Sequence, residues 1–137
     1  TEAWDLKYDP HDLSWSHAWS ASPAHIIPRR IMGIEPAEPG FGKIIIKPQP
    51  GDLKWAKMKL PSINGDIVVD VNQEEGNYFD LNTTIPANTT AKVYLPKLSG
   101  NYTLTVDGKM IRDAVTDGNW LVVNSASGNH IFKIKKN

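Results

Sequence analysis

The sequence contains no cysteine in its 137 residues. A disulfide framework and a thiolate metal site are therefore excluded, although the lack of cysteine does not indicate a compartment. Lysine plus arginine and aspartate plus glutamate both number 15, so the formal net charge is zero. Nucleic acid and anionic membranes are therefore not expected as partners, because both require a basic surface.

Several other signals are missing. No apolar run reaches the roughly 20 residues of a membrane span, and no basic segment followed by an apolar one predicts a signal peptide. There is no G-x-S-x-G nucleophile elbow. His11 and His17 are six residues apart, which matches no common zinc spacing, so neither a metal nor a cofactor is predicted. The start at Thr1 predicts a piece of a longer bacterial protein, whose compartment (cytoplasmic, periplasmic or secreted) stays open.

Hydrophobic residues make up 40% of the chain, which suffices for one domain with a sizeable core. One helix is expected over residues 23–32, because a single stripe of apolar residues recurs there at helical spacing. Ser22 is the expected N-cap, Pro28 is expected to kink the helix, and Gly33 is expected to end it. The stripe consists of Ala24, Ile27 and Ile31, flanked by Ile26 and Met32.

Beyond the helix the sequence predicts short strands. Residues 34–42 contain two prolines and two glycines and predict an elbow, and the apolar run at 43–47 predicts a buried strand. Asn64-Gly65 and Asp107-Gly108 predict tight hairpin turns. With no further helical segment, the fold class is mainly β, an antiparallel sandwich of about eight or nine strands after one helix. The expected strands are 43–47, 54–60, 67–71, 78–84, 91–95, 102–106, 110–111, 120–123 and 130–134.

Acidic, histidine and tryptophan residues gather in the first 20 positions. Indole rings stack on the C–H faces of sugars, while carboxylates hydrogen-bond hydroxyls and transfer protons, so such a mixture is typical of a sugar subsite. The alternative is a linker whose aromatic residues pack on a neighbouring domain. The residues are Glu2, Trp4, Asp5, Asp9, His11, Asp12, Trp15, His17 and Trp19.

Three aromatic residues of the sandwich, Trp55, Tyr78 and Trp120, are candidates for a carbohydrate-binding surface. A binding module would align them on one face, but sandwich cores also use large aromatic side chains. Trp120 precedes an apolar run and is expected to be packed. Glycosylation sequons begin at Asn82, Asn88 and Asn101, but such matches are common by chance and specify no function.

Three ordered motifs resemble the C-terminal region of family 78 glycoside hydrolases, the bacterial α-L-rhamnosidases. The resemblance runs from Thr1 to about Val71 and then weakens into a general strand pattern. The motifs are SHAWSASP at 16–23, GIEPAEPG at 33–40 and IKPQPGDLKWA at 46–56.

The resemblance implies that residues 1–33 are the last loop and helix of a catalytic (α/α)6 barrel and that residues 34–137 are a C-terminal β-sandwich accessory domain. The family removes terminal α-L-rhamnose with inversion, which needs an acid and a base roughly 6.5–9.5 Å apart. Glu2 matches the general base of the family. Trp4, His17 and Trp19 match positions that contact the sugar, and the general acid lies upstream of this chain.

The resemblance therefore predicts a C-terminal fragment of an inverting α-L-rhamnosidase-like hydrolase that acts on rhamnose-containing glycans. Alone it is expected to be inactive, since half of an acid/base pair without its pocket is not positioned for catalysis. The sandwich is expected to support the missing barrel through the elbow and the strand at 43–47. The alternatives are a carbohydrate-binding module using Trp55 or Tyr78 and a general interaction domain.

The truncation carries an expectation of its own. Without the barrel, the apolar stripe of the helix at 23–32 has no cover, and an exposed patch of this kind tends to find a partner. The helix is therefore expected either to dock back onto the sandwich or to form a helix-mediated dimer.

Overall fold

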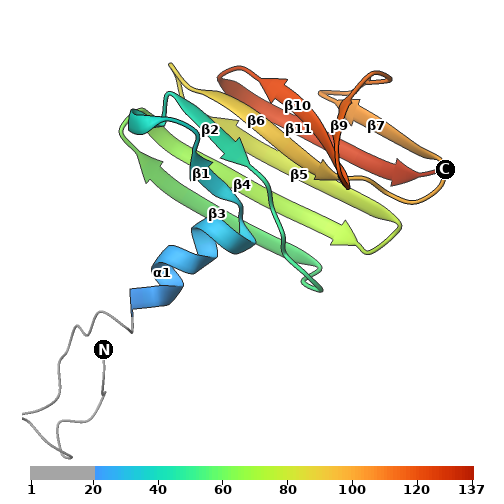
Figure 1. Ribbon diagram of the computed structural model, residues 1–137, viewed down its shortest axis with the longest axis horizontal. Helices are drawn as coiled ribbons and strands as arrows, with labels where there is room; N and C mark the ends of the chain where they lie inside the picture. The colour runs from blue at the N-terminus through green and yellow to red at the C-terminus, as the bar shows by residue number, and fades with distance from the viewer. Residues whose placement is uncertain (1–20) are drawn as a thin grey trace, which may run out of the picture.

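The computed structural model describes residues 21–137, which form a short helix followed by a two-layered β-sandwich (Figure 1). The helical segment has an α-helical part, α1 (Ser22–Ile26), and a π-helical part, η2 (Ile27–Ile31). A 3₁₀ turn, η3 (Pro39–Phe41), separates the first two strands. None of the helices in the described part of the chain has the length and apolar character needed to cross a bilayer.

Eleven strands in residues 21–137 form two sheets, which confirms the predicted mainly-β sandwich. The five-stranded sheet has the order β1 (Ile34–Pro36), β2 (Lys43–Ile46), β6 (Thr90–Pro96), β10 (Trp120–Ser125) and β9 (Val115–Asp117). The six-stranded sheet has the order β3 (Trp55–Ser62), β4 (Gly65–Glu74), β5 (Tyr78–Ile85), β11 (Gly128–Lys136), β7 (Tyr102–Val106) and β8 (Lys109–Met110).

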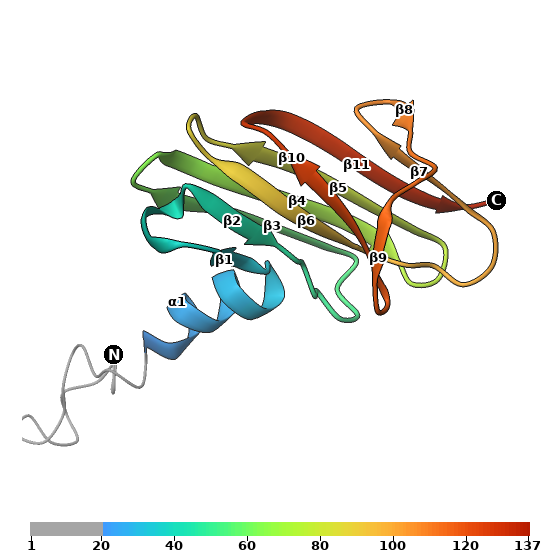
Figure 2. The same ribbon diagram turned by 45° about the horizontal axis from the view of Figure 1, so that its top comes forward.

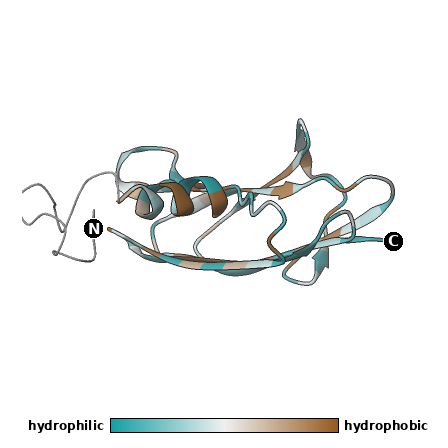
Figure 3. Cartoon of the chain, turned by 90° about the horizontal axis from the view of Figure 1, so that it is seen from below, coloured by the Kyte–Doolittle hydropathy of each residue, from teal (hydrophilic) through white to brown (hydrophobic). Residues whose placement is uncertain are grey.

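The core lies between the two sheets, which Figure 3 shows edge-on as two layers. The longer strands contribute alternate side chains to it, as the period of two along a strand requires, whereas the residues of β8 and β9 are exposed. In β4, for example, Ile67, Val69 and Val71 have no exposed surface, and in β11 Phe132 and Ile134 are equally buried. The alternation predicted for the strands at 54–60 and 67–71 is therefore confirmed, with one face of β3 and one face of β4 packed in or against the core.

One sheet departs from the purely antiparallel prediction. β2 pairs with β6 in parallel, with Lys43 opposite Thr90 and Ile46 opposite Val93, so the five-stranded sheet is mixed. Parallel neighbours need a long crossover connection. Here three strands of the other sheet, β3, β4 and β5, supply that connection between β2 and β6.

The predicted helix is present, and its hydrogen bonding changes next to Pro28. The ring of Pro28 carries no N–H to donate, and from Ile27 the helix adopts π-helical bonding, with the amide of Met32 donating to the carbonyl of Ile27 at 3.0 Å. The helix begins at Ser22 after Ala21, which makes no side-chain cap, so the prediction of Ser22 as N-cap was wrong by one position. Figure 2 shows the helix beside β1, at the edge of the five-stranded sheet.

Gly33 ends the helix, as predicted, and brings it against β2. Its φ of +65° is left-handed, a conformation that favours glycine. Its carbonyl accepts a hydrogen bond from the amide of Lys47 at 2.9 Å. A Cβ atom at this position would lie 1.9 Å from the carbonyl oxygen of Lys47, so no side chain fits between the two backbones.

The elbow at 34–42 contains a strand that the sequence did not predict. Its first three residues form β1, which pairs with β2 even though Pro36 ends it. Behind the turn, the buried hydroxyl of Thr89 donates to the carbonyl of Phe41 at 3.1 Å, and the amide of Asn64 donates to the same carbonyl at 3.3 Å. The elbow is thus fixed to both sheets, because Asn64 belongs to the β3–β4 turn.

We expect Gly33→Ala to destabilise the chain by about 3 kcal/mol or more, since the left-handed conformation and the overlap with Lys47 act together. Gly51 is a matched control, with a φ of +62° and open space around it. Gly51→Ala should cost only about 1 kcal/mol, the conformational part alone. Urea unfolding of the two variants measures the difference, and equal losses would disprove the role of the close contact.

Candidate functional site

The residues that the resemblance assigns to catalysis and sugar contact, Glu2, Trp4, His17 and Trp19, all lie outside the described residues. Their assignment stays a prediction. Residues 21–137 present the outer faces of the two sheets as surfaces on which a partner or ligand could bind, and these faces differ in character.

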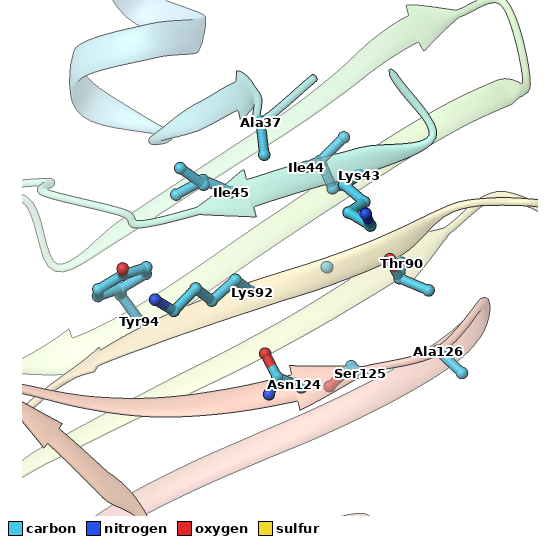
Figure 4. Close-up of a pocket in the computed structure, with 11 residues that line it drawn as sticks. Ala37, Lys43, Ile44, Ile45, Thr90, Lys92, Tyr94, Asn124, Ser125 and Ala126 are labelled. Carbon is cyan, nitrogen blue, oxygen red and sulfur yellow. The ribbon is translucent and has the colours of Figure 1, made fainter. Parts of the chain in front are cut away.

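The outer face of the five-stranded sheet carries an apolar groove of about 570 Å³ across β2, β6 and β10. Figure 4 shows its lining, with Ile45 and Tyr94 among the side chains and with Lys43 and Lys92 beside them. Asn124 lines the same groove from β10. The groove is therefore an apolar surface with amines at its margin.

A second cavity of about 240 Å³ continues this groove toward the helix. It shares Ile45 and Tyr94 with the first and is also lined by Arg29, Arg30 and Glu35. The carboxylate of Glu35 lies 3.6 Å from Arg29 Nε and 3.9 Å from Arg30 Nη1. The two cavities together form one continuous surface, which we call the β2 groove.

Aromatic rings and lysines close one side of the β2 groove. The rings of Tyr94 and Trp120 meet edge to face, with centroids 6.4 Å apart and planes at 78°. The ammonium of Lys47 lies 5.0 Å from the Tyr94 centroid and 4.7 Å from the Trp120 centroid, and Lys92 lies 5.3 Å from that of Tyr94. These distances are within the range of cation–π interactions, which hold the two lysine side chains against the aromatic rings. Tyr94 is buried by this cover although its side chain points away from the core.

The helix docks by its C-terminal end and leaves its beginning uncovered. Met32 is buried in the core and Ile31 packs against it, while Ile26 and Ile27 are 48% and 38% exposed. The expected docking onto the sandwich is thus present for the last turn. A dimer through the exposed part of the stripe stays a prediction.

The outer face of the six-stranded sheet is covered by pairs of opposite charge. Lys57 lies 2.8 Å from Asp70, Lys59 lies 2.6 Å from Asp66, and on the far side Lys133 reaches Asp80 at 3.4 Å. A balanced polar face of this kind suits water. Trp55 interrupts it at the sheet edge, with 71% of its surface exposed.

Within residues 21–137, His130 and Asp107 form a further pair of titratable side chains in contact. Nδ1 of His130 lies 2.9 Å from a carboxylate oxygen of Asp107, and Nε2 lies 3.1 Å from the carbonyl of Ala126. The other Asp107 oxygen accepts a hydrogen bond from the amide of Ile131 at 2.8 Å. Both imidazole nitrogens are therefore occupied, and the pair fastens the β7–β8 turn to β11. Within residues 21–137 no three histidine or acidic side chains group as metal ligands would.

Comparison with known proteins identifies the family to which this sandwich belongs. The model of the bacterial alpha-L-rhamnosidase C-terminal domain matches residues 33–109, more than half of the chain. The chain belongs to this family. Its match begins at Gly33, directly after the helix, and includes β1 to β7.

Individual relatives agree with the family. The chain is 29% identical over 126 residues to an alpha-L-rhamnosidase of Streptomyces avermitilis, covering 91% of this chain and 12% of that enzyme. The alpha-L-rhamnosidase structure from Dictyoglumus thermophilum is 31% identical over 80% of this chain, with a TM-score of 0.74. The Streptomyces avermitilis enzyme complexed with L-rhamnose is 28% identical over 83%, with a TM-score of 0.68.

This C-terminal domain spans about an eighth of the length of these relatives, 13% and 11% of the two solved chains. Of the β2 groove, the sequence predicted only the strand at 43–47 and the adjoining elbow as a packing surface, and not the part formed by the helix, β6 and β10. Its residues come from the helix, β2, β6 and β10, which are separated along the chain. The local signal was the run Val93–Leu95, three consecutive buried residues, which indicates a strand covered on both faces.

The Asp107–His130 contact predicts a pH dependence of stability. The hydrogen bond from His130, helped by the Ile131 amide and the charge of Lys109, holds the pKa of Asp107 below its ordinary value. Because the folded pKa is the lower one, this contribution is complete above the unfolded value of about 3.9 and is lost as the pH falls through the folded value.

Asp107→Asn should therefore lower the free energy of unfolding at neutral pH, and its difference from the parent chain should vanish as the pH falls below about 4. Asparagine tolerates the φ of 51° at this position, so the substitution tests the charge alone. Thermal unfolding from pH 3 to pH 7 measures the difference. A gap independent of pH would refute the assignment.

Proposed function

We propose that this domain is the C-terminal accessory part of an inverting glycoside hydrolase that removes terminal α-L-rhamnose, and that it supports a catalytic barrel upstream. The observation that carries the proposal is the family match together with the small share of each relative that this chain covers. In those relatives most of the chain lies outside the matched part. The L-rhamnose complex of one relative supports rhamnose glycans as the substrates of the parent protein.

The β2 groove is the surface that the proposal assigns to the catalytic part. It adjoins the helix, which the resemblance counts as the last helix of the barrel, and it includes Ile45 of the strand expected to pack there.

The β2 groove is also basic, since five cationic side chains line it and only two carboxylates, Glu35 and the nearby Glu38, lie beside them. We infer a partner surface that is apolar with carboxylates at its margin, because charge complementarity directs such contacts. The cations are Arg29, Arg30, Lys43, Lys47 and Lys92.

The chain by itself is expected to release no product from an aryl α-L-rhamnoside, whereas the longer protein is active. Glu2 is the candidate general base, and its acid partner lies upstream in the family, so the pair and its pocket are incomplete here. The measurement is chromophore release by the 137-residue chain beside the longer protein at equal molar concentration. Turnover by the short chain that Glu2→Gln abolishes would overturn the expected inactivity.

The docking surface is tested with two matched isoleucines. Ile45→Glu places a charge in the β2 groove, and Ile131→Glu places one on the 46%-exposed Ile131 of the other face. In the longer protein we expect Ile45→Glu to lower the melting temperature by several degrees and to reduce activity, because it presses a carboxylate against a partner surface that is apolar with carboxylates at its margin. Ile131→Glu should change neither.

The isolated chain provides the control for folding. In it both substitutions lie on a surface and should alter stability to a small and similar degree. If Ile45→Glu destabilises the isolated chain as strongly as the longer protein, its effect belongs to the sandwich and the docking proposal fails.

A further inference from the structure

The outer face of the six-stranded sheet carries an exposed tryptophan, Trp55, beside several ion pairs. Trp55 pairs with Asn72 of β4, and 71% of its surface is exposed. Leaving an indole in water forgoes the apolar burial that large aromatic side chains normally gain. A flat ring held on a rigid strand is a platform for a ligand.

Tyr78 extends this platform through a polar link. Its hydroxyl donates to the side-chain oxygen of Asn72 at 3.2 Å, so the phenol ring leans from β5 across β4 toward Trp55. Strand spacing places the backbones of Trp55 and Tyr78 roughly 12 Å apart. Among the described residues the amide nitrogen of Asn72 makes no hydrogen bond, so it is left to donate to a ligand.

A cavity of about 460 Å³ lies beside these residues, at the end of the sheet. Tyr78 and Asn72 line it together with Leu53, which is 46% exposed, and with three carboxylates and one amine. The loop that forms its other wall is held in place, because the amide of Gln73 donates to the carbonyls of Gly51 and Leu53 at 2.7 and 2.9 Å. The charged residues are Asp52, Glu74, Glu75 and Lys54.

We propose that Trp55, Asn72 and Tyr78, with the adjoining cavity, form a binding site for a neutral oligosaccharide. The indole and phenol rings stack on the C–H faces of sugar rings, and the Asn72 amide and the cavity carboxylates bond their hydroxyls. Two aromatic rings on different strands and an adjoining cavity offer contacts to more than one sugar ring, so the site takes a chain of sugars rather than a monosaccharide.

Charge decides between neutral and acidic glycans. Three carboxylates against one lysine give the cavity a negative surplus. Uronic acids and sulfated sugars are repelled by it, whereas hydroxyl groups are good donors to carboxylates. The site therefore selects a neutral chain.

This site is independent of the proposed docking surface, since the two lie on opposite outer faces of the sandwich. Docking of the five-stranded sheet would leave the six-stranded sheet open to glycan. The loss of either function would not remove the other.

The test is to titrate the 137-residue chain with sugars and to monitor binding by backbone amide NMR and by calorimetry. The probes are L-rhamnose, a neutral rhamnose-terminated oligosaccharide, cellohexaose and oligogalacturonate. We expect saturable shifts around Trp55, Asn72 and Tyr78 with a neutral oligosaccharide, and weaker binding of L-rhamnose and oligogalacturonate. Trp55→Ala should weaken binding about tenfold or more. Tyr78→Phe, which removes only the hydroxyl that orients Asn72, should weaken it about fivefold.

Val115→Ala is the matched control, because Val115 is 68% exposed on the other sheet. It should bind as the parent chain does, and thermal unfolding should show all variants folded. The proposal fails if no neutral oligosaccharide gives saturable shifts at millimolar concentration, or if binding is unchanged in folded Trp55→Ala. It also fails if oligogalacturonate binds more tightly than the neutral chains.

Discussion

The parallel pairing of β2 with β6 is the constraint on which the rest of the domain depends. β2 lies between β1 and β6, so its backbone bonds attach the elbow to the larger part of the five-stranded sheet. Ile44 and Ile46 face the core and are buried, while Ile45 faces the β2 groove. Immediately after β2, the amide of Lys47 donates a hydrogen bond to the carbonyl of Gly33, which ends the helix. Core, groove and helix attachment therefore share five consecutive residues, and moving β2 by one residue would exchange its faces.

Much of this architecture follows from local sequence. The alternation in β3 and β4 and the Asn64-Gly65 and Asp107-Gly108 turns act within a few residues, so pattern alone predicts them. The parallel contact of β2 does not follow, because its partner lies more than 40 residues away. β1 was missed because Pro36 disfavours a strand, yet a proline is tolerated at the end of an edge strand. β9 is only three residues long and has no period to detect.

The candidate surfaces were predictable to different degrees. Trp55 and Tyr78 are single conspicuous residues, and period-two alternation places both on the wet face of their strands. The β2 groove depends on Lys47, Tyr94 and Trp120 coming together from three segments. No local sequence pattern predicts the contact of these three residues. The residues expected to act in catalysis stand in the first 20 positions, and they are known only through the resemblance.

The two outer faces differ in how they treat charge, and this difference separates their roles. On the six-stranded sheet Lys57, Lys59 and Lys133 each pair with a carboxylate on a neighbouring strand, so these charges are satisfied in water. On the five-stranded sheet Lys47 and Lys92 instead lie on the ring of Tyr94. A cation on an aromatic face gains strength when water is removed, whereas an exposed ion pair contributes little and loses its hydration when covered. The five-stranded face therefore tolerates burial by a large partner. The six-stranded face favours a hydrated ligand such as an oligosaccharide at Trp55.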